Sequence, residues 1–124
     1  MSGFADLAMV TIDCDDPQAL ARFWSEVLGR EVSHSEEYYA MVDGAGGAPL
    51  GFGRVEGYRP PQWPNPDGTK QYHLDLYVDD IDKAAERCLA LGATRPAFQP
   101  GDTWTVLLDP SGHPFCLCRR SGEQ

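Results

Sequence analysis

The stretch that decides the fold is Gln71-Tyr72-His73-Leu74-Asp75-Leu76-Tyr77-Val78-Asp79-Asp80. Its residues alternate between two sets. The apolar set is Tyr72, Leu74, Leu76 and Val78, and the polar set is His73, Asp75 and Tyr77. A period of two predicts a strand over residues 71–78 with one buried face and one polar face. Asp80 then offers a side-chain oxygen to cap a helix, and the spacing becomes helical.

A histidine and a carboxylate two residues apart point the same way along a strand. His73 and Asp75 can therefore meet the same ligand. The alternative is an ordinary solvated strand face on which the two groups only pair with each other. The stretch by itself leaves both interpretations open.

Length and charge narrow the possible functions. A chain of 124 residues suits one domain with its own core. The net charge of −9, from 19 acidic and 10 basic residues, argues against nucleic acid and against anionic membrane surfaces as partners. The sequence contains no apolar run of about 20 residues and no signal peptide, so we expect a cytoplasmic protein.

The four cysteines fall in predicted strands or in a predicted helix, not in a loop-rich scaffold. Such cysteines are expected to be reduced thiols rather than a disulfide framework. They are Cys14, Cys88, Cys116 and Cys118.

The first half of the chain predicts a strand, a helix and three further strands. Alternation marks a strand over residues 7–14, and a helix is predicted over 17–28. Asp16 is its cap, Pro17 its first residue and Gly29 its left-handed end. Three more strands are predicted, over 31–35, 38–43 and 50–55.

Residues 57–70 include four prolines, which exclude most of this segment from a sheet interior. It is predicted to link two halves of the chain. Its aromatic residues, Tyr58 and Trp63, either cover a pocket or cap the edge of the core.

The second half repeats the order of the first. The strand at 71–78 leads into a predicted helix over 81–91, a short strand over 95–98, and strands over 103–108 and 115–119. The order strand–helix–strand–strand–strand therefore occurs twice, over residues 5–56 and 70–120.

The motifs of this doubled unit resemble the vicinal oxygen chelate superfamily, which includes the glyoxalase, bleomycin-resistance and extradiol dioxygenase proteins. The similarity rests on two strand-to-helix junctions, a helix end and a turn. In sequence these are Thr11-Ile12-Asp13-Cys14-Asp15-Asp16, His73 to Asp80, Leu89-Ala90-Leu91-Gly92-Ala93, and Leu108-Asp109-Pro110-Ser111-Gly112-His113-Pro114-Phe115.

The resemblance implies an α+β fold in which the whole chain, residues 1–124, is a single glyoxalase-like domain. Each βαβββ unit would curl its sheet into a half-barrel with its helix on the convex side. Paired units would form a cup that holds the ligand. His73, Asp75 and Tyr77 would face the cup, and the alternating leucines would face the helix.

Metal-dependent members of the superfamily place one ligand on the first and one on the last strand of each unit. The matching positions here are Met9, Gly51, His73 and Cys116, of which only His73 is a usual ligand in that family. The sequence therefore predicts no metal site and no cofactor. Coordination of a soft ion by His73 with Cys116 and Cys118 stays open.

Two functions remain. The first is a metal-free protein that binds a small aromatic or cationic molecule. The residues expected to contact that molecule are Thr11, Asp13, Tyr58, Trp63, His73, Asp75, Tyr77 and Trp104. The alternative is an enzyme of the lyase, isomerase or dioxygenase type, which would be either metal-free or dependent on a metal in an atypical site. In the metal-free case His73 is the general base, and Asp75 or Asp13 is its charge partner.

A homodimer is also expected, because small members of this superfamily commonly pair two chains to complete two cups.

Overall fold

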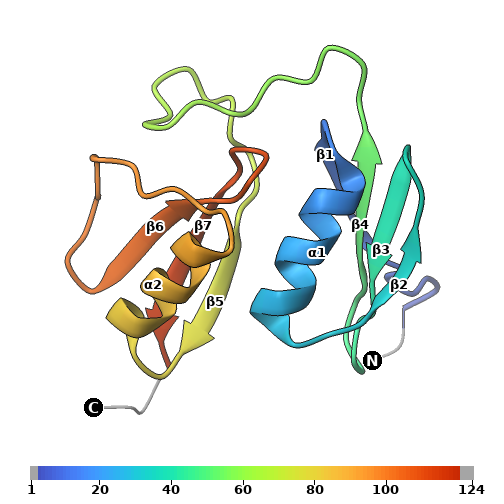
Figure 1. Ribbon diagram of the computed structural model, residues 1–124, viewed down its shortest axis with the longest axis horizontal. Helices are drawn as coiled ribbons and strands as arrows, with labels where there is room; N and C mark the ends of the chain where they lie inside the picture. Colours follow the sequence, from blue (N-terminus) through green and yellow to red (C-terminus); the bar gives the residue numbers. More distant parts are fainter. Residues whose placement is uncertain (1–2, 121–124) are drawn as a thin grey trace. The chain divides into compact units, whose positions relative to one another are not determined.

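The computed structural model describes residues 3–120, which divide between Tyr58 and Arg59 into two compact units, unit 1 and unit 2 (Figure 1). The ends of the predicted domain, residues 1–2 and 121–124, lie outside the described residues. Each unit consists of one helix packed on one sheet, so the predicted α+β class is confirmed.

Unit 1 holds a four-stranded sheet in the order β1-β4-β3-β2. Its elements are β1 (Val10–Cys14), α1 (Pro17–Leu28), β2 (Val32–Ser35), β3 (Tyr39–Val42) and β4 (Leu50–Arg54). Strand β1 pairs with β4 in parallel, and the remaining pairs are antiparallel. The first strand begins three residues later than predicted, at Val10 rather than at residue 7.

Helix α1 begins and ends where the sequence places it. Asp16 Oδ1 accepts a hydrogen bond from the Ala19 N–H at 3.2 Å, Pro17 is at the first turn, and Gly29 has a φ of 66°. The apolar face of α1 packs on the sheet, where Trp24 and Phe52 are fully buried. Burial of these large side chains is the main source of unit 1's stability.

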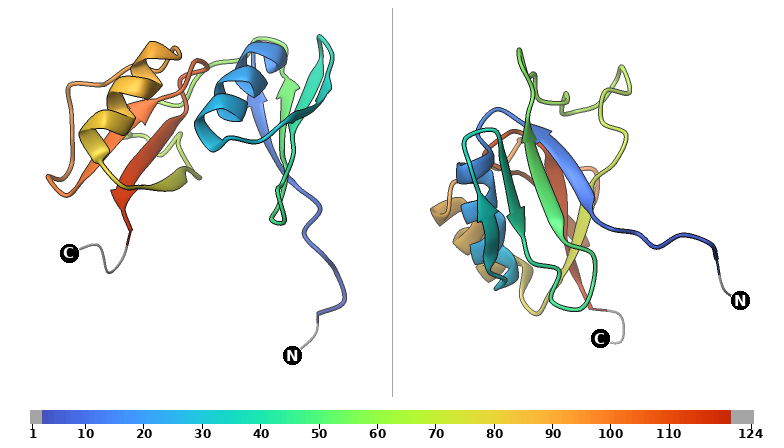
Figure 2. Two further views of the ribbon diagram at one scale, coloured as in Figure 1. Left: turned by 60° about the horizontal axis from the view of Figure 1, so that its bottom comes forward. Right: turned by 90° about the vertical axis from the view of Figure 1, so that its right-hand side faces the viewer.

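Unit 2 holds a three-stranded sheet in the order β5-β7-β6. Its elements are β5 (Leu74–Val78), α2 (Ile81–Ala90), β6 (Trp104–Leu108) and β7 (Pro114–Arg119). Strand β5 runs parallel to β7, and β6 is antiparallel to it. Helix α2 lies on one face of this sheet (Figure 2), capped by Asp80 Oδ1, which accepts the Lys83 N–H at 3.0 Å.

The strand predicted over residues 95–98 does not form. Only an isolated bridge joins Thr94 to Leu108. Beyond this bridge, the Gln99 side chain makes the hydrogen bonds to β6 that a neighbouring strand would make. Gln99 accepts the Val106 N–H at 2.8 Å and donates to the Val106 carbonyl at 2.9 Å. Pro96 and Pro100 flank this contact, and prolines cannot donate to a regular ladder.

The proline-rich segment lies with unit 2 from Arg59 onward. Trp63 Nε1 donates to the Phe98 carbonyl at 3.0 Å, and the two rings lie 6.1 Å apart between centroids. Lys70 Nζ lies 5.5 Å from the centre of the Trp63 ring. Because of these contacts the segment is docked on its own unit and is not a free linker.

None of the helices in residues 3–120 is long and apolar enough to cross a membrane.

Candidate functional site

The pleat of β5 separates its side chains as the sequence predicts. Asp75 and Tyr77 are exposed, whereas Leu74, Leu76 and Val78 are half-buried. The register places Leu74 opposite Phe115 and Leu76 opposite Leu117 on the face that α2 covers. His73 lies one residue before β5, because the strand begins at Leu74 and not at residue 71.

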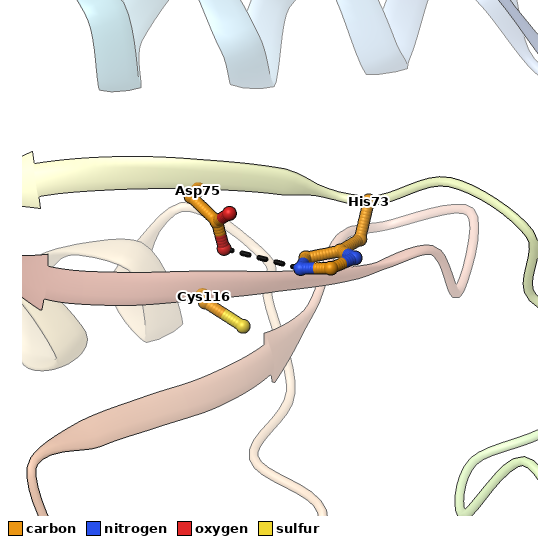
Figure 3. Close-up of side chains that lie close together, drawn as sticks. All are labelled: His73, Asp75 and Cys116. Atoms are coloured by element: carbon orange, nitrogen blue, oxygen red, sulfur yellow. Dashed lines mark ion pairs between the residues drawn. The ribbon is translucent and has the colours of Figure 1, made fainter.

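Three polar groups of unit 2 converge on the opposite, polar face of the sheet, at the start of β5. His73 Nε2 lies 3.2 Å from Asp75 Oδ1, and Cys116 lies opposite Asp75 on the parallel strand β7. Donor atoms of all three residues lie within 4.8 Å of one another, and their side chains point to the same side of the sheet (Figure 3). Histidine, aspartate and cysteine therefore form one cluster, which we call the His73–Asp75–Cys116 cluster.

The Cys116 thiol is strongly held in its protonated form. Burial is the first cause and the neighbouring Asp75 carboxylate the second, through its charge and a hydrogen bond, and together they raise the thiol pKa from 9.0 to about 11. The pKa of Cys118 is raised by the same two causes, burial and the charge of Asp75. Since the thiolate is the reactive form, neither cysteine is an activated nucleophile at neutral pH.

The aromatic side chains of unit 2 extend the polar face along the strands. Tyr77 is opposite Cys118 on β7, and Cys118 is opposite Trp104 on β6, so the three share the face of Asp75. Tyr77 is 60% exposed and Trp104 is 36% exposed. The face thus combines two accessible rings with an accessible imidazole and carboxylate.

A hollow of unit 2 lies elsewhere, beside α2. It has a volume of about 600 Å³ and lies between the start of α2, the segment before β6 and the end of β7. Of the residues predicted to contact a ligand, only Trp104 lines it. Trp63 lines a second, shallower depression formed by residues 62–66.

In unit 1, Thr11 and Asp13 are exposed on the face of β1 turned away from α1. The register places them opposite Gly51 and Gly53 of β4. Tyr58 follows β4 at the end of unit 1 and is half-buried. The structure therefore divides the predicted contact residues between the units: Thr11, Asp13 and Tyr58 in unit 1, and Trp63, His73, Asp75, Tyr77 and Trp104 in unit 2.

The metal positions implied by the resemblance do not fit in unit 1. Gly51 has no side chain, and a Cβ built there would lie 2.6 Å from Tyr39 Oη and 3.1 Å from both Met9 Sδ and Thr11 Oγ1. Tyr39 Oη is hydrogen-bonded to Met9 Sδ at 3.0 Å. The place of a metal ligand is thus filled by a tyrosine hydroxyl and a thioether, a poor donor set for a hard divalent ion.

This filled space predicts a steric cost for Gly51→Ala. We expect the free energy of unfolding to fall by about 1–2 kcal/mol, because the new methyl group must displace the Tyr39 hydroxyl. Urea unfolding measures the change. In a Tyr39→Phe background, which lacks that hydroxyl, the cost should shrink; an equal cost in both backgrounds would show that Tyr39 does not occupy this space.

Comparisons with known proteins agree with this geometry. A family model described as a glyoxalase-like domain matches residues 9–118. A search of curated protein sequences finds no match.

Solved structures share the fold over nearly the whole chain. A glyoxalase/bleomycin resistance protein/dioxygenase family enzyme from Burkholderia phytofirmans PsJN is 25% identical, with a TM-score of 0.68, and the match covers 91% of this chain and 97% of the other. A glyoxalase-related enzyme from Fulvimarina pelagi is 21% identical, with a TM-score of 0.67, covering 94% and 89%. The bleomycin-binding protein of Streptomyces verticillus, complexed with copper(II)-bleomycin, is 20% identical, with a TM-score of 0.58, covering 98% and 100%.

Proposed function

Because the chain belongs to the glyoxalase-like domain family, we propose that it binds a small organic molecule on the polar faces of its sheets. The contacts are made by side chains and need no complete metal site. The proposal rests chiefly on one observation, the exposure of His73, Asp75 and Tyr77 on one face of the sheet of unit 2.

The chemistry of this face favours a flat or cationic ligand. The rings of Tyr77 and Trp104 offer π-faces, and Asp75 offers a carboxylate whose side chain is 62% exposed. The net charge of −9 attracts cations to the protein as a whole. An aromatic amine satisfies both features, and the bleomycin-binding protein with the same fold supports small-molecule binding as the general role.

A thermal-shift screen with a panel of aromatic amines, run with a chelator present, tests the proposal. A compound that stabilises the protein is then titrated against variants. His73→Ala and Tyr77→Ala should each weaken binding by about tenfold, equivalent to roughly 1.4 kcal/mol.

Tyr72→Ala is the matched control, because Tyr72 is 91% exposed and lies just before β5. In the period-two pattern it falls on the side of Leu74 and Leu76, not on the side of Tyr77. It should bind the compound as well as the unmodified protein. Equal losses for Tyr72→Ala and Tyr77→Ala would place the ligand off this face.

The contact between His73 and Asp75 favours a second candidate, a metal-free lyase, isomerase or dioxygenase-type enzyme. At 3.2 Å the carboxylate can orient the imidazole, as a general base requires. Turnover of a compound found in the screen, lost in His73→Ala and reduced in Asp75→Asn, would favour the enzyme over the binding protein.

The proposal includes a cytoplasmic homodimer. Cell fractionation tests the compartment, and light scattering at micromolar concentration tests the assembly. A mass of twice 13.7 kDa is expected, and a monomer mass would exclude the dimer.

A further inference from the structure

The hollow beside α2 shares only Trp104 with the residues proposed to bind a ligand on the polar faces. Its volume of about 600 Å³ lies within the roughly 300–1,000 Å³ of small-molecule sites in proteins. All of its walls belong to unit 2, and they come from the start of α2, the segment before β6 and the end of β7. The hollow is therefore a separate place in which a small molecule fits.

Charged groups of both signs line this hollow. Arg95 and Arg119 contribute two guanidinium groups, and Asp82 and Asp102 contribute two carboxylates. None of these four side chains takes part in an ion pair within residues 3–120. Their charges are therefore available to a ligand.

The other two carboxylates of the hollow are already engaged. Arg120 Nε donates to Asp79 Oδ1 at 3.2 Å, and Asp80 Oδ1 accepts the Lys83 N–H at the start of α2. The available charges are thus balanced, with two positive and two negative groups.

Both arginines extend from backbone that strand pairing holds. Arg119 is the last residue of β7 and lies opposite Val78 of β5. Arg95 directly follows Thr94, which forms the isolated bridge to Leu108. The positive side of the hollow is therefore anchored to the sheet.

Trp104 gives the hollow a flat aromatic wall. Its ring lies directly against the backbone of Gly101, where an added Cβ would be only 2.2 Å from Trp104 Cη2. Only glycine leaves room for the ring in this position. The side chain is 36% exposed, so part of the ring stays accessible to a ligand.

We propose that the hollow binds a zwitterion with a flat ring, of the class of the aromatic amino acids. Arg95 and Arg119 bind its carboxylate, because the planar guanidinium group matches a carboxylate in shape and charge. Asp82 and Asp102 bind its ammonium group, and its ring stacks on Trp104. A ligand of a single charge is disfavoured, because an anion meets the two carboxylates and a cation meets the two guanidinium groups.

The inference goes beyond the proposed function and does not depend on it. His73 and Tyr77, which carry the proposed function, do not line the hollow. Backbone amides of residues 80–82 and 101–103 report on the hollow, whereas those of residues 73–77 report on the polar face. Either site can therefore fail while the other holds.

An NMR titration of the full-length chain with three indole compounds tests the proposal. L-tryptophan carries both charges, tryptamine only the ammonium group and indolepropionate only the carboxylate. L-tryptophan should shift the amides of residues 80–82 and 101–103 until they saturate. The other two compounds should bind there about tenfold more weakly or less, because each leaves one pair of charged groups without a partner.

Variants assign the two charges of the ligand. The double substitution Arg95→Gln and Arg119→Gln should abolish the preference for L-tryptophan over tryptamine. The double substitution Asp82→Asn and Asp102→Asn should abolish the preference over indolepropionate. Gly101→Ala, which displaces the indole ring of the protein, should weaken the binding of L-tryptophan.

Arg87→Gln is the matched control, because Arg87 is an exposed arginine of α2 that does not line the hollow. It should leave the binding of all three compounds unchanged. The proposal is overturned if L-tryptophan does not shift residues 80–82 and 101–103, or if either singly charged compound binds there as tightly. It is also overturned if Arg87→Gln loses binding as the double arginine variant does. Circular dichroism checks the fold of each variant, and the four charged side chains replaced in the hollow are all exposed.

Discussion

Leu117→Ala is expected to lower the free energy of unfolding by about 2–5 kcal/mol, the range for deleting a fully buried leucine side chain. Leu117 is completely buried on the face of β7 that α2 covers, opposite Leu76 of β5 and Thr105 of β6. Truncation leaves a cavity between sheet and helix that neighbouring side chains fill only in part. Urea unfolding followed by circular dichroism measures the change.

Cys116→Ala is the control, because Cys116 precedes Leu117 and points to the opposite, polar face. Its cost should stay below about 1 kcal/mol. Equal costs for the two variants would mean that β7 does not separate a core face from a ligand face. The functional interpretation of the polar face would then lose its structural basis.

Asp109→Ala is the second substitution with a large expected effect, about 2–4 kcal/mol. Asp109 is 3% exposed, and its Oδ1 accepts the N–H groups of Ser111 at 2.9 Å and His113 at 3.0 Å. Removing the carboxylate leaves both amides of this turn without that acceptor, and each unsatisfied buried group costs about 1–3 kcal/mol. The turn joins β6 to β7, so its loss also weakens the register that places Cys116 beside Asp75.

Asp109→Asn is the matched variant, because it keeps one side-chain carbonyl oxygen as acceptor. Thermal unfolding should place its stability between those of the unmodified protein and Asp109→Ala. If Asp109→Ala unfolds at the same temperature as the unmodified protein, the side chain does not hold the turn.

Local chemistry explains which parts of the fold could be predicted from the sequence. Asp16 and Asp80 cap the two helices as expected. An N-cap needs only one side-chain oxygen, which accepts a hydrogen bond from the backbone N–H three residues later. The prediction of a strand over residues 95–98 is wrong. Hydrogen bonds from the Gln99 side chain to the Val106 backbone take the place of backbone pairing there. Nothing in a period-two pattern distinguishes those two outcomes.

The candidate site was predicted in part for a similar reason. Alternation along one strand placed Asp75 and Tyr77 on one face, and the structure brings His73 to Asp75. In the sequence, Cys116 stands out only as a match to a family ligand position and as a neighbour of Cys118, not as a neighbour of Asp75. That contact depends on the parallel pairing of the first and last strands of unit 2, which local sequence does not encode. The structure repeats this pairing in unit 1, where Thr11 lies opposite Gly51.

The most direct test of small-molecule binding on the polar face is an NMR titration with a compound from the thermal-shift screen. We expect the largest chemical-shift changes on the backbone amides of residues 73–77, 104–106 and 116–118, and little change on the amides of α2. Changes concentrated on α2, with residues 73–77 unaffected, would contradict it.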